Sequence, residues 1–262
     1  MPTIEVDDGV RIAYEVAGDD EGAADLVLVH GITESRRTWD PLVDRFGERG
    51  YRVIGLDLRG HGESGLAAAY DLGSMAADVG AVLGAVGADR PLLVGHSLGG
   101  AVVSAYAAAG SCRGVVNVDQ PLALGGFKEA LAPLEALLRG APDEFMTAIS
   151  AVFEQMVGPL DGAERARVEG LRRASQDVVL GVWDLVLTSD VADLDAVVDQ
   201  LAGAITVPYL SLHGIDPGPD YPDWLADRIG HLSFEVWAEH GHYPHLVDPD
   251  RFVARVAAFD AR

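Results

Sequence analysis

The sequence predicts an α/β fold in which a mostly parallel, eight-stranded sheet carries helices on both faces and a helical insertion after its sixth strand. Two observations predict it. Apolar runs of strand length alternate with segments of helical periodicity over residues 1–120 and 201–262, which is typical of parallel strands joined by helical crossovers. Between these two core segments the strand signal disappears. With 262 residues, 49% of them hydrophobic, the chain can bury a sizeable core.

Two kinds of pattern predict the strands. A hairpin opens the chain, because residues 3–6 and 10–16 alternate between apolar and polar side chains around the turn signal Asp7-Asp8-Gly9. Apolar runs typical of strands covered on both faces predict the other six: residues 25–30, 51–57, 91–95, 113–119, 205–212 and 233–237. Helices are expected between the strands: residues 38–49, 74–86, 98–109, 224–229 and 250–259. Ser74 is the expected N-cap of the second helix.

The insertion is predicted to be helical throughout. Glycine, proline and serine breaks divide it into four helices: residues 127–138, 143–157, 163–173 and 177–187. It follows the strand that ends at Asp119 and therefore leaves the carboxyl edge of the sheet, where ligands bind in folds of this class. We therefore expect residues 121–200 to form a cap over a site at that edge.

A candidate nucleophile lies at residue 97. The predicted strand that ends in Val94-Gly95 is followed by His96-Ser97-Leu98-Gly99-Gly100 and then by a helical segment rich in alanine and valine. In this G-x-S-x-G arrangement a strained strand-to-helix turn exposes the serine hydroxyl, and the two glycines leave room for neighbouring backbone. The pattern predicts that Ser97 is a catalytic nucleophile.

A serine hydroxyl needs a base, usually a histidine that a carboxylate holds in one tautomer. Three of the eight histidines, His240, His242 and His245, follow the last predicted strand, in a loop that can reach the carboxyl edge of the sheet. We expect His242, which follows Gly241, to be the base. No metal site is expected at His240 and His242, because the sequence suggests no thiol or carboxylate ligands beside them.

Four motifs together resemble the α/β-hydrolase superfamily, in the serine-nucleophile branch with a helical cap: His30-Gly31-Ile32, residues 57–64, residues 95–100 and residues 241–249. The resemblance covers the core and not the cap. It implies the α/β-hydrolase fold, His242 as the base and catalysis without a cofactor. It also implies an oxyanion hole formed by the backbone N–H groups of Ile32 and Leu98.

The acid of the triad departs from the family pattern. The resemblance places it after the seventh strand as Gly-x-x-Asp, whereas this chain has His213-Gly214-Ile215-Asp216, with the aspartate one position early. Some relatives carry the acid at the end of the sixth strand, where this chain has Asp119. Asp216 and Asp119 both stay candidates.

Substrate contacts are expected from the cap and from the loops around Ser97. An apolar pocket with a few polar groups is the usual form of a small-molecule site. The expected contact residues are Gly31, Trp39, Leu122, Phe145, Met146, Phe153 and Trp183.

The net charge of the chain limits the classes of partner that it is expected to bind. A net charge of −22 repels the phosphates of nucleic acids and anionic lipids, so neither nucleic acid nor a membrane is expected to bind. The expected partner is a small-molecule substrate, and a homodimer stays open. The sequence has no apolar run of transmembrane length and no signal-peptide pattern at its start, so we expect a cytoplasmic protein.

Together these features predict a cofactor-free serine hydrolase that cleaves an ester, lactone or related acyl bond of a small, largely apolar substrate through an acyl-enzyme. Carbon–carbon bond hydrolysis and perhydrolase or haloperoxidase-type activity would use the same triad. The alternative from another class is a ligand receptor on the same scaffold, which would bind its ligand with negligible turnover.

Overall fold

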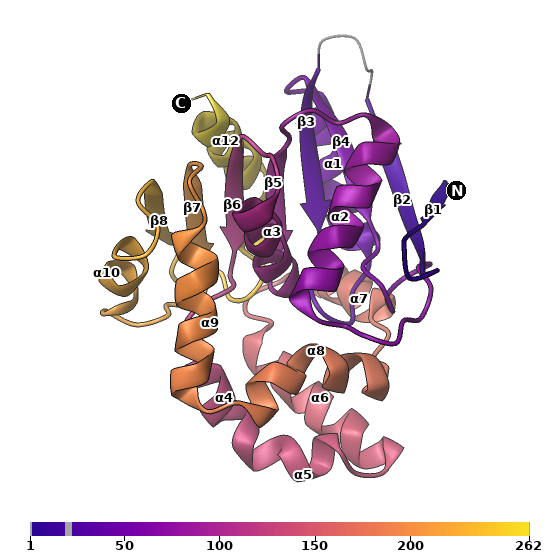
Figure 1. Cartoon of the computed structure of the whole chain (residues 1–262), viewed down its shortest axis with the longest axis vertical. Helices are drawn as coiled ribbons and strands as arrows, with labels where there is room; N and C mark the ends of the chain where they lie inside the picture. The colour runs from indigo at the N-terminus through magenta and orange to yellow at the C-terminus, as the bar shows by residue number, and fades with distance from the viewer. Residues whose placement is uncertain (1, 19–22, 262) are drawn as a thin grey trace.

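Eight strands form one sheet in the computed structural model, which describes residues 2–18 and 23–261 (Figure 1). The strand order is β1-β2-β4-β3-β5-β6-β7-β8, with β1–β2 and β2–β4 antiparallel and the other pairs parallel. The strands are β1 Thr3–Glu5, β2 Arg11–Ala17, β3 Ala24–Val29, β4 Tyr51–Leu56, β5 Leu92–His96, β6 Gly114–Val118, β7 Tyr209–His213 and β8 Leu232–Val236. The predicted sheet is thus confirmed, except that residues 1, 19–22 and 262 of the expected core lie outside the described residues.

The register of the parallel strands brings their carboxyl ends to one edge. Val29 of β3 pairs with Gly95 of β5, Gly95 with Asn117 of β6, and Asn117 with Ser211 of β7. The residues that follow β3, β5, β6 and β7 therefore meet at that edge, although up to about 180 positions separate them along the chain.

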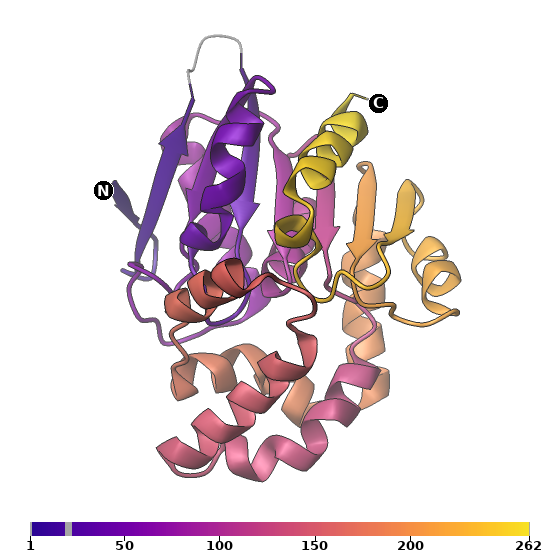
Figure 2. The ribbon, with the colours of Figure 1, turned by 180° about the vertical axis from the view of Figure 1, so that it is seen from behind.

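Helices cover both faces of the sheet. α2 (Leu72–Val86) and α3 (Leu98–Ala109) lie on one face, and α1 (Asp40–Gly47) and α12 (Pro249–Asp260) on the other (Figures 1 and 2). The short helix α10 (Tyr221–Ala226) lies next to β8, and the short helix α11 (Pro244–Val247) lies next to α12. No helix in the described part of the chain is both long and apolar enough to cross a membrane.

The chain between β6 and β7 is helical and gathers beyond the carboxyl edge of the sheet (Figure 1). Its elements are α4 Gly125–Leu131, a 3₁₀ turn Ala132–Leu134, α5 Glu135–Leu138, α6 Pro142–Met156, α7 Gly162–Leu171, α8 Gln176–Thr188 and α9 Val191–Gly203. α9 runs back from this region to pack on α3 of the core. The cap boundary expected at residue 200 therefore falls inside a helix that belongs to both parts.

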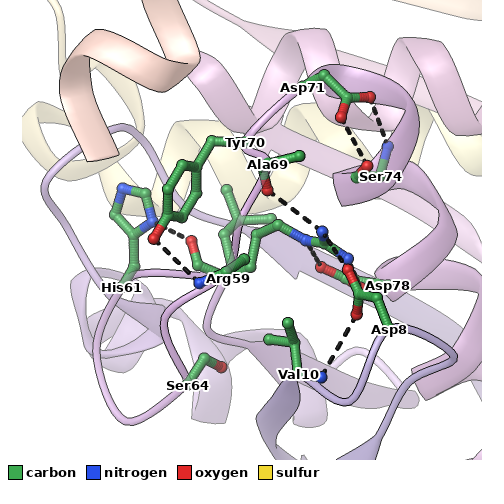
Figure 3. A network of polar contacts seen from close by, with 12 residues as sticks. Asp8, Val10, Arg59, His61, Ser64, Ala69, Tyr70, Asp71, Ser74 and Asp78 are labelled. Atoms are coloured by element: carbon green, nitrogen blue, oxygen red, sulfur yellow. Dashed lines mark hydrogen bonds and ion pairs between the residues drawn. The ribbon is translucent and has the colours of Figure 1, made fainter. Parts of the chain in front are cut away.

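Several local expectations differ from the structure, among them the helix expected at residues 127–138, which is divided into α4, the 3₁₀ turn and α5, and the one expected at residues 224–229, which is α10. α2 begins earlier than expected, and its N-cap is Asp71 in place of Ser74: the Asp71 carboxylate accepts the backbone N–H of Ser74 at 2.9 Å (Figure 3). β7 begins at Tyr209 and not at residue 205, because Pro208 has no N–H to donate to a neighbouring strand. α9 was not predicted as a separate helix.

Candidate active site

Ser97 occupies the turn between β5 and α3 in a strained conformation. Its backbone angles are φ 51° and ψ −124°, in a region that side chains rarely adopt. A Cβ atom on Gly95 would overlap the backbone of Gly99, and one on Gly99 would overlap the carbonyl of Val29. The two glycines therefore let the strand, the turn and the helix approach closely enough to form this elbow.

His242 lies in the loop after β8 and is held from two sides. Its Nδ1 is 2.6 Å from Oδ2 of Asp119, and its backbone N–H donates to the carbonyl of Met156 at the end of α6. His242 and Asp119 are both buried, at 5% and 4% exposure. An imidazole that shares Nδ1–H with a carboxylate presents Nε2 as the proton acceptor, the tautomer a serine nucleophile requires.

Asp119 follows β6 directly and is fixed by the neighbouring strand. Its Oδ1 accepts the N–H groups of Gly214 and Ile215, at 2.8 and 3.0 Å, from the loop after β7. Burial alone would raise the pKa of the Asp119 carboxyl, but His242 and the Ile215 amide bring that pKa below its usual value. The side chain is therefore ionised at neutral pH and can stabilise an imidazolium.

Asp216 lies elsewhere. It is exposed, and its carboxylate accepts the N–H of Gly218 within its own turn. The structure thus brings Asp119 to His242 and leaves Asp216 in solvent. The loop after β7, where the family pattern placed an acid, here supplies two N–H donors to Asp119.

The two expected oxyanion donors also meet at this edge. Leu98 is the first residue of α3, so its N–H has no acceptor within the helix, and the positive end of the helix dipole lies beside it. Ile32 lies in the loop after β3. Both residues line the cavity that also contains Ser97 and His242. An anionic oxygen formed next to Ser97 would be stabilised by such donors.

A cavity of about 1110 Å³ opens above Ser97 between the cap and the core. Of the expected substrate contacts, Leu122, Phe153 and Trp183 line it. Much of the remaining wall is contributed by small or apolar side chains of α3, of α9 and of the residue after α9, none of which was an expected contact: Ala101, Ala105, Ala108, Val197, Val198, Leu201 and Ala204. Their signal was the apolar spacing of the two helices, but that spacing does not tell a cavity wall from a packed interface.

Four expected substrate contacts lie outside the lining. Trp39 is buried against His245, with ring centroids 4.5 Å apart. Phe145 packs inside the cap at 2% exposure, whereas Met146 next to it is 47% exposed on the outer surface of α6. Gly31 packs against Glu34. These residues were expected because they are apolar or lie close to the elbow in the sequence. The sequence could not show whether their side chains face the cavity.

Polar groups at the cavity are few. Besides Ser97, His242 and Asp119, the residues Asp71 and Asp184 contribute polar groups, and the described lining contains no lysine or arginine. The hydroxyl of Tyr221, which sequence reasoning missed, accepts the N–H of Leu122 at 2.8 Å and fixes the loop after β6. Within residues 2–18 and 23–261, no group of three or more His, Cys, Asp or Glu side chains could hold a metal ion.

Comparisons with known proteins agree with the fold. The family model described as "Alpha/beta hydrolase family" matches residues 26–255. A non-heme haloperoxidase from Rhodococcus erythropolis is 30% identical, with 99% of both chains covered. Among solved structures, esterase RhEst1 from Rhodococcus sp. ECU1013 has a TM-score of 0.75 at 28% identity, covering 99% of this chain and 97% of that one. Est816, described as an N-acyl homoserine lactone degrading enzyme, has a TM-score of 0.77 at 25% identity, covering 98% and 100%.

Proposed function

The chain belongs to the alpha/beta hydrolase family and is a hydrolase, and we propose that it cleaves carboxylic esters or lactones through an acyl-enzyme on Ser97. The observation that carries the proposal is the hydrogen bond from His242 to Asp119 at the wall of the cavity that contains Ser97. No cofactor is needed for this chemistry.

Each residue has a defined task in the proposed mechanism. Ser97 Oγ attacks the substrate carbonyl while His242 Nε2 removes its proton, and Asp119 stabilises the resulting imidazolium. The N–H groups of Ile32 and Leu98 stabilise the oxyanion, and one such donor typically contributes about 3–4 kcal/mol to lowering the barrier. His242 then protonates the leaving alcohol. A water molecule, deprotonated by His242, releases the acid from Ser97.

The cavity favours an uncharged substrate with a substantial apolar part. Burial of a hydrocarbon group against side chains such as Leu122, Phe153 and Trp183 removes apolar surface from water and is favourable. The described lining offers no cation to pair with a carboxylate or phosphate. Asp71 and Asp184 would repel an anionic substrate and favour departure of the anionic acid product.

A second candidate activity follows from the likeness to a haloperoxidase. Hydrogen peroxide can attack the acyl-enzyme in place of water, which releases a peracid and restores the Ser97 hydroxyl. Adding peroxide to the ester assay and measuring peracid would detect this activity.

The proposal is tested with p-nitrophenyl esters of graded chain length and a set of lactones, using the wild type and Ser97→Ala. We expect the wild type to turn over neutral substrates from this panel. Ser97→Ala should lose about 10⁴-fold or more in kcat, as is typical when a serine nucleophile is removed. A folded wild type without turnover on the panel, or a variant that keeps its activity, would contradict the proposal.

A further inference from the structure

A second buried polar network lies beside the candidate triad and is centred on Glu34. This side chain is 3% exposed. Its Oε1 accepts the hydroxyl of Tyr243 at 2.7 Å, and its Oε2 accepts the backbone N–H of Gly31 at 3.1 Å. Nδ1 of His96 lies 3.4 Å from the same Oε2. Three separate segments of the chain therefore meet at one carboxylate.

Each partner of Glu34 is the chain neighbour of a residue in the proposed mechanism. Gly31 precedes the oxyanion donor Ile32, His96 precedes the nucleophile, and Tyr243 follows the base. His96 also donates from Nε2 to the backbone carbonyl of His242, at 2.7 Å. The network thus holds the backbone of the oxyanion loop and of the base loop against the strand that ends at the nucleophile.

The electrostatics indicate that Glu34 is ionised. Burial alone would raise its pKa, but the neighbouring His96 and the hydroxyl of Tyr243 bring that pKa well below its usual value. A carboxylate without these donors would be costly to bury, and the donors would in turn lose their acceptor if it were removed. The arrangement is consequently rigid.

The cap is attached to the same network. Arg172 donates to the hydroxyl of Tyr243 at 2.7 Å, and its guanidinium lies 4.1 Å from the ring centroid of Phe153, which lines the cavity. The backbone N–H of Arg173 donates to the carbonyl of Thr33 in the oxyanion loop at 2.8 Å. Contacts of the cap with substrate can therefore bear on both catalytic loops through short chains of bonds.

We propose that Glu34 is a positioning residue, which fixes the oxyanion donor Ile32 and the base His242 relative to each other and to the cap. The inference rests on the proposed function. Glu34 touches neither substrate nor reacting atoms, so its effect is on the geometry of the transition state more than on substrate binding. Misplacing a catalytic group by about 1 Å can cost about 100-fold in rate.

Glu34→Gln tests the inference because it keeps the size of the side chain but replaces one acceptor oxygen by an NH₂ group. We expect kcat on a p-nitrophenyl ester to fall about 10- to 100-fold, with KM changed less than about 3-fold. Affinity for a trifluoromethyl ketone, which forms an oxyanion adduct with a serine, should fall in parallel with kcat/KM. Tyr243→Phe, which removes one donor to Glu34, should give a smaller loss of the same kind.

Asp78→Asn is the matched control. Asp78 is similarly buried, at 1% exposure, and binds Arg59 at 2.7 Å (Figure 3). Neither Asp78 nor Arg59 is part of the described cavity lining. The substitution Asp78→Asn should lower thermal stability and leave the kcat of the folded enzyme within about 2-fold of the wild-type value. A folded Glu34→Gln with wild-type kcat, or a loss confined to KM, overturns the inference alone. A wild type that turns over none of the esters or lactones overturns the proposed function instead, and the inference with it.

Discussion

Ser97 and Asp119 share an unusual feature, a positive φ in a residue other than glycine, at 51° and 54°. Such backbone is costly, by about 1–3 kcal/mol per residue, and persists only where surrounding contacts impose it. The close approach of Gly95 and Gly99 imposes it on Ser97, and the two amides after β7 hold the side chain of Asp119. At both of these positions a side chain must project from the end of a strand.

The choice between the two acids leads to a direct prediction. Asp119→Asn should lower kcat by about 10⁴-fold, because an amide at this position favours the wrong tautomer of His242. Asp216→Asn should leave kcat within about 3-fold, since this side chain is exposed and accepts the N–H of Gly218 within its own turn. Steady-state kinetics of both variants on one ester decide the matter, and equal losses in the two would refute the assignment.

The candidate residues could be predicted from the sequence where the signal is local. The elbow motif and the Gly-His loop predicted that Ser97 and His242 belong to one site, and the structure places both in the lining of one cavity. The sequence could not decide between Asp119 and Asp216. The position of Asp119 depends on β6 and β7 being neighbours and on hydrogen bonds from two backbone N–H groups, which leave no signal in the sequence. Glu34 was missed for the same reason: its partners are a backbone N–H and side chains more than 60 positions away.

At the scale of elements, the cap also meets the base loop through a close backbone contact. Gly158, after α6, has a φ of +67°, and a Cβ atom there would lie 2.6 Å from Cα of Gly241. Gly241 itself precedes His242 and also has a positive φ. This contact leaves no room for a side chain, so the end of α6 and the base loop must move together.

Gly158→Ala should therefore displace the base loop and lower kcat by about 10-fold or more, with a loss of thermal stability. Gly162→Ala is the matched control, because Gly162 begins α7 with open space where its Cβ would be. We expect it to keep wild-type kcat. Kinetics and melting curves of the two variants provide the comparison, and indistinguishable enzymes would show that the contact has no bearing on catalysis.

α9 shows where prediction of elements failed. The segment after Asp190 has a helix N-cap and an apolar stripe at helical spacing (Val191, Leu194, Val198, Leu201), of which Leu194 and Val198 are buried. Some of these side chains pack on α3 and others line the cavity. Three valines, three aspartates and a glycine in this segment are weak helix formers, so intrinsic preference opposed the helix that the apolar spacing favoured.

For the whole molecule, the alternation of apolar runs and helical segments was enough to predict the class of fold. A parallel sheet covered on both faces requires every one of its strands to be apolar, and such runs are easy to recognise in a sequence.

Histidines are also buried in this core. His61 and His213 are 4% and 0% exposed, and burial lowers the pKa of each from 6.5 to about 4. Both are therefore neutral in the folded protein at pH 7.

The stability of the molecule should consequently fall on acidification. Below about pH 6.5 the unfolded chain binds a proton at each of these histidines, and the folded protein does not until about pH 4. At pH 5 the difference amounts to about 2 kcal/mol for each group. Urea unfolding at pH 7.5 and pH 5 measures the fall. His61→Asn removes one of these groups and should shrink the fall by about 2 kcal/mol; an unchanged unfolding free energy at pH 5 would contradict this account.

The central claim is that Ser97 is activated as a nucleophile in the folded protein. Its most direct test is reaction with a fluorophosphonate, followed by peptide mapping on a mass spectrometer. The account predicts a phosphonyl adduct on the peptide that carries Ser97, formed rapidly by the wild type and orders of magnitude more slowly by His242→Ala. A folded protein that stays unlabelled, or an adduct on another residue, would contradict it.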